Sequence, residues 1–205
     1  MKRTAALLLA LSASVAFAAP ASAADQVTAQ ADLDGNGVLD TVTAETIAGN
    51  GNEQLLTATI QGLRLTALAP LDSHVGIQPL RVVDLNDDGT DEVVVTQSVG
   101  ANTVGFGVWG FSGGLRPVTG TTGSALKLWE GGGISALNGY GCENSGDGRV
   151  LVAVDARLTN QPKGIYTGKR VTYTVENGVA TETARTSVAG PWDAPGFQAD
   201  PDACA

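Results

Sequence analysis

Histidine is nearly absent from this sequence of 205 residues, and cysteine occurs only as Cys142 and Cys204. Two thiols and the lone His74 cannot complete a tetrahedral zinc site without carboxylate ligands, so we expect no zinc centre. A Gly-x-Ser-x-Gly match around Ser112 lacks a suitable base, because His74 precedes the serine whereas the hydrolase order places the histidine after it. The sequence therefore predicts no serine hydrolase and places His74 in a surface loop.

Basic residues are also scarce, with 12 Lys and Arg against 21 Asp and Glu and a formal net charge of −9. Phosphate backbones are bound by clustered lysines and arginines, so this balance argues against a nucleic-acid partner. No basic amphipathic run points to binding at a membrane surface. An acidic chain of this kind is compatible with bound metal cations.

Long apolar runs are missing except at the start of the chain. The segment 4–18 is rich in Ala and Leu, but it is shorter than the roughly 20 residues needed to span a bilayer. It follows Lys2 and Arg3 and precedes the small-residue pattern Ala-Ser-Ala at 21–23, which is typical of a cleaved signal peptide over 1–23. The protein is therefore predicted to be secreted to the extracellular space, without a membrane span. The mature chain would carry 10 basic and 21 acidic residues, a net charge of −11.

Export of the protein would allow its two cysteines to be oxidised. An oxidising compartment allows Cys142 and Cys204 to form one disulfide, and two free thiols are the alternative. Because Cys204 is the penultimate residue, the bond would tie the proline-containing tail 191–205 to the loop around Cys142. We expect this tail to be an extended strap.

Convincing amphipathic helices are lacking too, whereas 27 glycines and many short β-branched runs are present. Runs of four to eight residues bounded by Gly, Asn and Asp are typical of strands. They lie at 41–47, 55–61, 63–68, 80–83, 92–98, 103–111, 115–119, 150–157, 170–175 and 179–183. Asn177-Gly178 between two of these runs predicts a tight hairpin, and the Ser-Gly-Gly sequence at 112–114 predicts another. We therefore predict an all-β domain over 24–190.

Two acidic loops carry the most specific signal. The first loop, 32–40, and the second loop, 84–92, both fit D-L-[DN]-x-[DN]-G-x-x-[DE], with oxygen-bearing side chains at positions 1, 3, 5 and 9. Calcium takes six to eight oxygen ligands, and a loop curled around the ion presents alternate side chains to it. The glycine at position 6 permits the sharp turn that this requires. The predicted calcium ligands, including a backbone carbonyl at position 7, are Asp32, Asp34, Asn36, Val38 and Asp40 in the first loop and Asp84, Asn86, Asp88, Thr90 and Glu92 in the second.

Other interpretations of these loops are less favourable. An EF-hand needs an acid at position 12 and flanking helices, but position 12 is Thr43 in one loop and Val95 in the other, both within strand-like runs. Asp, Asn and Gly also form turns without any metal, which is the plain alternative. Agreement of two loops at five positions favours a metal site. A third segment, 143–151, has Leu151 at position 9, and we interpret it as a degenerate copy.

The second loop and the Val-rich run after it resemble the calcium loop of FG-GAP/VCBS repeats, which occur in integrin α-subunit propellers and many secreted bacterial proteins. The resemblance covers the two loops and the run after each, and the Phe-Gly and Gly-Ala-Pro parts of the family motif are not evident. It implies propeller-blade-like β-meanders joined by loops whose calcium ions stabilise the structure. The loops begin at 32, 84 and 143, which leaves room for about three blade-sized units. Closed propellers have four to eight blades, so an irregular β-barrel or sandwich is the alternative architecture.

These features predict a secreted, non-catalytic protein with structural calcium and a role in adhesion or in binding an extracellular protein or glycan. No catalytic constellation is evident. One alternative is an enzyme acting on extracellular polysaccharide, with carboxylates such as Glu130 or Asp155. Its sugar-binding face would draw on the aromatic residues Trp109, Trp129, Tyr140 and Trp192. Another alternative is an inhibitor or partner-binding protein.

Overall fold

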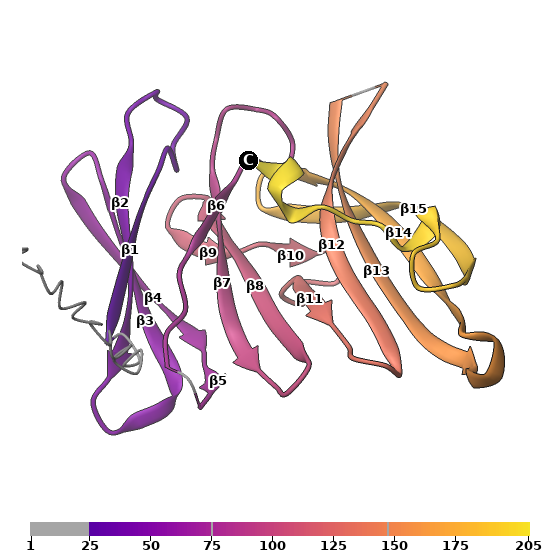
Figure 1. Cartoon of the computed structure of the whole chain (residues 1–205). Helices are drawn as coiled ribbons and strands as arrows, with labels where there is room; N and C mark the ends of the chain where they lie inside the picture. The colour runs from indigo at the N-terminus through magenta and orange to yellow at the C-terminus, as the bar shows by residue number, and fades with distance from the viewer. Residues whose placement is uncertain (1–24, 75, 147) are drawn as a thin grey trace, which may run out of the picture.

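The structure is a computed structural model that describes residues 25–205 apart from residues 75 and 147. The expected signal peptide over 1–23 lies outside the described residues. The described chain is all-β, as predicted, and forms two sheets, neither of which closes on itself. Figure 1 shows the ribbons of these sheets standing side by side from one end of the molecule to the other. No helix in the described part of the chain has the length and apolar character needed to cross a membrane.

The first sheet is an antiparallel meander of four strands in chain order. Its strands are β1 (Gln26–Ala31), β2 (Asp40–Ile47), β3 (Asn50–Ile60) and β4 (Leu63–Pro70). Alternation along β2 buries Val42 and Ala44 and leaves Thr41 exposed, the pattern of a strand with one covered face. A two-residue turn at Gln61-Gly62, with φ values of 49° and 81°, joins β3 to β4.

The second sheet has eleven strands. They are β5 (Asp72–Ser73), β6 (Arg81–Val83), β7 (Glu92–Val99), β8 (Thr103–Phe111), β9 (Leu115–Pro117), β10 (Thr119–Gly120), β11 (Lys127–Gly131), β12 (Ala136–Ser145), β13 (Gly148–Asn160), β14 (Ile165–Glu176) and β15 (Val179–Gly190). Their main path is β10-β15-β14-β13-β12-β11-β8-β7-β5, with β6 paired to β7 and β9 to β8. All pairings are antiparallel except β10 with β15 and β5 with β7.

Strand β7 separates two hydrophobic cores. Val93 and Val95 point into a core shared with the first sheet, where Leu56 of β3 and Trp109 of β8 also lie. Val94 points to the other side, into a core that contains Tyr140 and Leu151. Because both faces of β7 are covered, its sequence is a continuous Val run instead of an alternating one. The first of these cores joins the two sheets into one packed body.

Each strand predicted from the sequence overlaps an observed strand, and both predicted hairpins are confirmed. Asn177 and Gly178, with φ values of 51° and 75°, connect β14 to β15, and the segment 112–114 connects β8 to β9. The prediction missed β1, β5, β11 and β12. Strand β12 was obscured by its glycines, of which Gly141 is required because a Cβ there would lie 2.4 Å from the backbone of Asp200.

The segment 143–151 is not a third loop of the predicted shape. Glu143, Asn144 and Ser145 belong to β12 and pair with β13, and Ser145 lies opposite Gly148 at the tip of the hairpin. Gly146 follows β12 directly, so this segment belongs to a hairpin of two long strands. The interpretation of this segment as a degenerate loop copy was therefore wrong.

The C-terminal tail is fastened to the second sheet by the Cys142–Cys204 disulfide, which confirms that prediction. The tail contains two short 3-10 turns, η2 (Pro195–Phe197) and η3 (Pro201–Cys204), so it is less extended than expected. Another 3-10 turn, η1 (Gln161–Lys163), lies outside the tail and joins β13 to β14. Phe197 packs against Val154 and Ala156 and thereby covers one face of β13. The tail thus serves as a lid over a sheet face that would otherwise expose apolar side chains.

Replacing both cysteines, as Cys142→Ser with Cys204→Ser, is expected to lower the free energy of unfolding by about 2–4 kcal/mol. The reason is that the disulfide joins residues 62 positions apart and so restricts the unfolded chain. Urea denaturation of the exported protein, followed by tryptophan fluorescence with a chelator present, measures the change. An unchanged midpoint and slope would show that the cross-link contributes nothing to stability.

Candidate metal centre

The first loop (32–40) and the second loop (84–92) adopt the same backbone conformation. Position 4 is left-handed in both, with φ of 69° at Gly35 and 62° at Asp87, and position 6 is left-handed in both, with φ of 80° at Gly37 and 79° at Gly89. Aspartate tolerates this region better than most residues do, which explains Asp87 at a position that is glycine in the other loop. The shared sequence pattern therefore specifies a shared fold.

Hydrogen bonds within the first loop show how its side chains are held. Asp32 at position 1 accepts from the backbone N–H groups of Asn36, at 3.0 Å, and Gly37, at 2.6 Å. Asn36 accepts from the N–H of Val38 at 2.7 Å, and Asp40 accepts from the N–H of Leu33 at 3.2 Å. These bonds fold the loop back on itself, so that the oxygens of positions 1 and 9 meet at its centre.

The second loop repeats this scheme position by position. Asp84 accepts from the N–H groups of Asp88 and Gly89, at 3.3 and 3.0 Å. Asp88 accepts from the N–H of Thr90 at 2.8 Å, and Glu92 accepts from the N–H of Leu85 at 3.1 Å. The longer glutamate at position 9 makes the same bond that aspartate makes in the first loop.

The leucine at position 2 anchors each loop. Leu33 is completely buried in the core shared by the two sheets, and Leu85 is completely buried in the second core. Each leucine is followed at position 3 by a polar side chain that must turn toward the centre of the loop. Burial of the leucine therefore fixes the direction of the position 3 oxygen.

Carboxylates crowd together in the first loop. Asp32, Asp34 and Asp40 each present an oxygen, and these oxygens all lie within 4.8 Å of one another. Burial raises the pKa of Asp40, and the charges of Asp34 and Asp32 raise it further, while the hydrogen bond from the Leu33 N–H lowers it. Three like charges this close destabilise the loop unless a cation lies between them.

The second loop also has three carboxylates and one amide at these positions but arranges them differently, with Asn86 at position 3 and Asp88 at position 5. No comparably tight group of three acids is found there among the described residues. The unfavourably placed carboxylate of this loop is Glu92, which is buried on β7. Burial raises the pKa of Glu92 to about 7, and the charges of Asp88, Asp84 and Asp91 raise it further. Asn86 carries no charge, and the raised pKa of Glu92 favours its neutral form, so both reduce the repulsion between the acidic side chains of this loop.

One oxygen at position 3 of each loop is buried and has no hydrogen-bond donor. In the first loop this atom is Oδ1 of Asp34, and in the second it is Oδ1 of Asn86. The other atoms of both side chains are satisfied: Gln61 donates to Asp34 Oδ2 at 2.7 Å, and Asn86 Nδ2 donates to the carbonyl of Val175 at 2.9 Å. A buried acceptor without a donor costs roughly 1–3 kcal/mol. Two such atoms at equivalent positions indicate a missing partner of the same kind in both loops.

The donor set suits a hard cation. The side chains that converge in each loop are carboxylate and amide oxygens, which calcium prefers, and no nitrogen or sulfur ligand lies among them. The position 3 oxygens lack a donor, as expected for atoms that would contact an ion. All ten predicted ligand positions, from Asp32 to Asp40 and from Asp84 to Glu92, thus lie in two loops that fold alike.

The sequence did not reveal that the two loops touch. Asp91 at position 8 of the second loop accepts from the N–H of Asp32 at 2.7 Å through its carboxylate, and its own N–H donates to the carbonyl of Asp32 at 2.8 Å. A Cβ on Gly35 would lie 2.8 Å from the hydroxyl of Thr90. The seam between the two sheets therefore passes through both loops, with Asp91 as the link.

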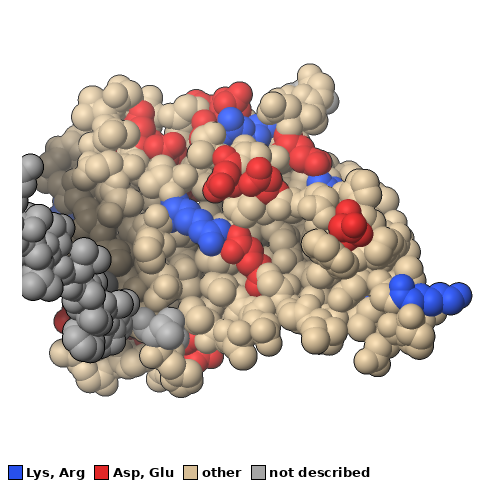
Figure 2. Space-filling view, viewed as in Figure 1, with Lys and Arg blue, Asp and Glu red and all other residues tan. Residues whose placement is uncertain are grey.

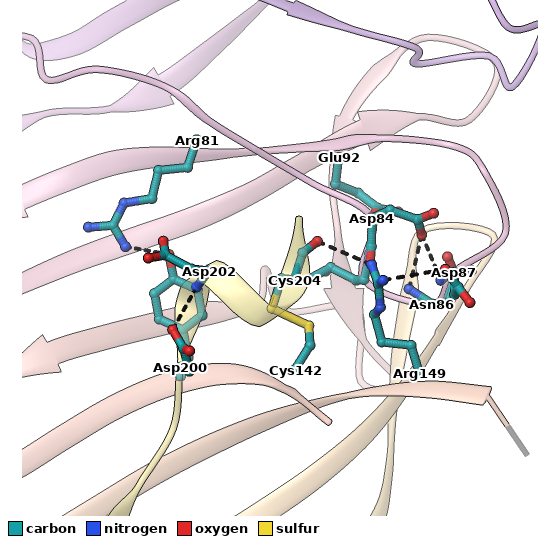
Figure 3. Close-up of a disulfide and its surroundings, with 12 residues drawn as sticks. Arg81, Asp84, Asn86, Asp87, Glu92, Cys142, Arg149, Asp200, Asp202 and Cys204 are labelled. Atoms are coloured by element: carbon teal, nitrogen blue, oxygen red, sulfur yellow. Dashed lines mark hydrogen bonds and ion pairs between the residues drawn. A yellow bond between two sulfur atoms is a disulfide. The ribbon is translucent and has the colours of Figure 1, made fainter. Parts of the chain in front are cut away.

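The second loop is also joined to the disulfide. Figure 3 shows Arg149 of β13 between the C-terminal turn and this loop. Its guanidinium donates to the carbonyls of Asp84, at 2.7 Å, and Cys204, at 3.3 Å, and it lies 3.4 Å from the carboxylate of Asp87. The N–H of Asp84 donates to the carbonyl of Cys204 at 2.8 Å. Position 1 of the loop is thus held by residues that are distant in sequence.

Other residues singled out from the sequence lie elsewhere. His74 is exposed in a turn, as expected. Glu130 is bound by Arg81, with contacts of 2.6 and 3.0 Å, and Arg81 also donates to Tyr140 at 2.8 Å. Tyr140 and Trp109 are buried in the cores. Of the four aromatic candidates for a sugar-binding face, only Trp129 and Trp192 are therefore exposed.

The surface charge agrees with the acidic composition. On the face viewed in Figure 2, acidic side chains gather over the upper half, with few basic ones between them. Comparison of the chain with models of protein families, with curated proteins and with solved structures yields no match. The assignment of the site therefore depends on its own geometry.

Asp91→Ala is expected to lower the free energy of unfolding by about 1–2 kcal/mol, because the partly buried N–H of Asp32 loses its acceptor and only the backbone bond from residue 91 to the carbonyl of Asp32 still joins the loops there. Asp91→Asn keeps an acceptor oxygen at the same place and should lose much less. The exposed Asp193→Ala in the tail is the control for removal of a carboxylate. Equal midpoints of all four proteins in urea would contradict a linking role for Asp91.

Proposed function

We propose that this is a secreted, non-catalytic calcium-binding protein in which each of the two loops holds one structural calcium ion. The observation that carries the proposal is the pair of buried, donor-free oxygens at the same position of two loops with the same fold. A calcium ion would be their common partner. Sequence and geometry thus support the same ligands, from Asp32 to Asp40 and from Asp84 to Glu92.

The benefit of the ion is electrostatic. Without it, the first loop brings together three carboxylates and the second buries Glu92, and the raised pKa values of Asp40 and Glu92 reflect this cost. A divalent cation converts the repulsion into attraction and supplies the missing partner of Asp34 and Asn86. Because the loops meet through Asp91, calcium would lock the seam between the two sheets.

The resemblance to FG-GAP/VCBS repeats supports this assignment, since calcium stabilises loops between β-strands in that family. We extend the proposal to repeated blade-like units, to export directed by the segment 1–23, and to a role in adhesion or in binding an extracellular protein or glycan. The disulfide between Cys142 and Cys204 fits an extracellular location. A catalytic role is not proposed, because Glu130, one of the two carboxylates considered for glycoside cleavage, is held in an ion pair with Arg81.

Calcium is expected to raise the melting temperature of the wild-type protein above its value in chelator. An ion bound only by the folded chain adds about 2.7 kcal/mol at a hundredfold excess over Kd, which corresponds to about 5–10 °C for a domain of this size. Scanning calorimetry at both conditions measures the shift. Identical melting curves in calcium and in chelator would refute the proposal.

Isothermal titration is expected to find two calcium ions per wild-type chain and one in either Asp34→Ala or Asn86→Ala. Each substitution removes the donor-free oxygen of one loop and leaves the other loop intact. Asp193→Ala, which removes an exposed carboxylate outside the loops, is the matched control and should still bind two ions. Retention of two ions by both loop variants would show that these oxygens do not contact the metal.

Arg149→Met is expected to weaken calcium binding by the second loop about tenfold and to leave the first loop unchanged. Methionine keeps the apolar stem of the side chain but removes the donors that hold the carbonyl of Asp84. Titration in the Asp34→Ala and Asn86→Ala backgrounds isolates each loop in turn. A uniform loss of affinity in both backgrounds would mean that Arg149 acts on the whole fold and not on its neighbouring loop.

A further inference from the structure

A groove of about 490 Å³ crosses the second sheet over β11, β12, β13, β14 and β15. Cross-strand partners project from the same face of a sheet. Asp155 lies opposite Lys169, Ala153 lies opposite Val171, and Val171 lies opposite Arg185, so these groove residues share one face. The opposite face of the same strands is the one covered by Phe197 of the tail. The groove is therefore a sheet face that the chain itself leaves open.

The charge of this groove is opposite to that of the protein. Of the 12 Lys and Arg in the sequence, Lys2 and Arg3 lie outside the described residues, and four of the other ten line the groove. These four are Lys127, Arg157, Lys169 and Arg185. The only acidic residue in the lining is Asp155, although the chain has 21 Asp and Glu. A site that concentrates positive charge in an acidic protein fits an anionic ligand.

Two of these cations are available to a ligand. Arg157 lies 3.7 Å from Asp155, and Arg185 donates to Glu182 at 2.7 Å, so both have a carboxylate partner. Lys127 and Lys169 are exposed, and neither forms an ion pair within the described part of the chain. They come from β11 and β14, so they stand on different strands of the groove and can contact separated charges.

An aromatic platform lies beside these lysines. Trp129 of β11 is 43 % exposed, which is unusual for so large an apolar side chain, and it lines the groove. Its ring is seated on Gly105 of β8, where a Cβ would come within 2.6 Å of the indole. The glycine therefore lets the indole lie close to the sheet. Ala153 and Val171 add an apolar floor.

We propose that this groove binds a short segment of an acidic polysaccharide. The flat apolar faces of the sugar rings would pack on Trp129 and on the floor formed by Ala153 and Val171, and the ring carboxylates would pair with Lys127 and Lys169. An open groove admits an internal segment of a long chain, whereas a closed cavity would admit only an end. This site is independent of the calcium loops and shares no lining residue with them.

A nucleic acid fits the groove less well. It carries a phosphate on every nucleotide, and binding normally requires many Lys and Arg contacts, whereas only two cations here lack a partner. An acidic polysaccharide combines a carboxylate with an apolar ring face on the same sugar, which fits two lysines without ion-pair partners beside one exposed indole.

The test is titration of the full exported protein with oligogalacturonate of about six sugars, followed by tryptophan fluorescence and calorimetry. The titration is made both in calcium and in EDTA: binding in calcium tests the groove in the fully stabilised protein, and binding in EDTA shows that calcium does not bridge the protein and the sugar. We expect binding with a change in Trp129 fluorescence, and at least tenfold weaker binding of a neutral maltohexaose. Trp129→Ala should weaken binding about tenfold, while Trp129→Phe should retain most of it.

Charge reversal supplies the second arm. Lys127→Glu with Lys169→Glu should weaken binding at least tenfold, whereas Lys163→Glu, an exposed lysine of η1 outside the groove, should leave it unchanged. Because both groove lysines are exposed, the melting temperature of the double variant should match that of the wild type. If Trp129→Ala is unstable, Trp129→Phe and the lysine variants decide the outcome. The proposal is overturned if oligogalacturonate does not bind, if the groove variants bind like the wild type, or if the neutral sugar or single-stranded DNA binds as tightly.

Discussion

Like charges at the seam between two sheets are the constraint on which the rest of the structure depends. Asp32, Asp34 and Asp40 meet within 4.8 Å of one another, at the point where the first sheet joins the second. The crowding follows from closure of the loop, because backbone N–H groups of the same loop hold Asp32 and Asp40 in place and the side chain of Gln61 holds Asp34. The seam therefore carries a crowded group of negative charges, which neither the disulfide nor the tail neutralises.

The two loops answer this constraint in different ways. The first uses three carboxylates, and its neighbours are the β3–β4 turn through Gln61 and the second loop through Asp91. The second has its amide, Asn86, at position 3 and a carboxylate, Asp88, at position 5, and it is bound on its outer side by Arg149 and the carbonyl of Cys204. The guanidinium is a fixed positive charge near the second loop, so this loop would depend less on a bound ion for its electrostatic balance. The first loop, by comparison, would be the more sensitive to removal of calcium.

The local part of this design could be predicted from the sequence. The pattern of Asp, Asn and Gly over nine residues determines which backbone N–H groups are available and which side chains can reach them, so the two loops at 32–40 and 84–92 could be located without the structure. The hairpin at Asn177-Gly178 was predictable for the same reason, because the turn type depends on two residues. Strand pairing could not be predicted in this way. Strands β5 and β10 are only two residues long, and they are strands because they pair with β7 and β15, which are distant in sequence.

Contacts between distant segments were beyond sequence reasoning. Nothing near Arg149 indicates that it binds the carbonyl of Asp84, and nothing near Asp91 indicates that it accepts from Asp32 in the other loop. Both depend on the order of strands in the sheets. The same holds for the groove, whose cations lie at 127, 157, 169 and 185 in a sequence that is acidic overall. The overall composition does not reveal this cluster, because the sequence is acidic as a whole and the four cations come together only in the folded sheet.

The acidic loops and the basic groove lie on different parts of the molecule. Screening at physiological ionic strength limits the reach of exposed charges to about 8 Å, so acidic loops at the seam do not cancel a basic groove on another part of the sheet. A chain that needs carboxylates for metal binding at one place can therefore present cations at another. In the proposed arrangement a metal ion would hold the two sheets together at the seam, and the open sheet face would remain free for a ligand.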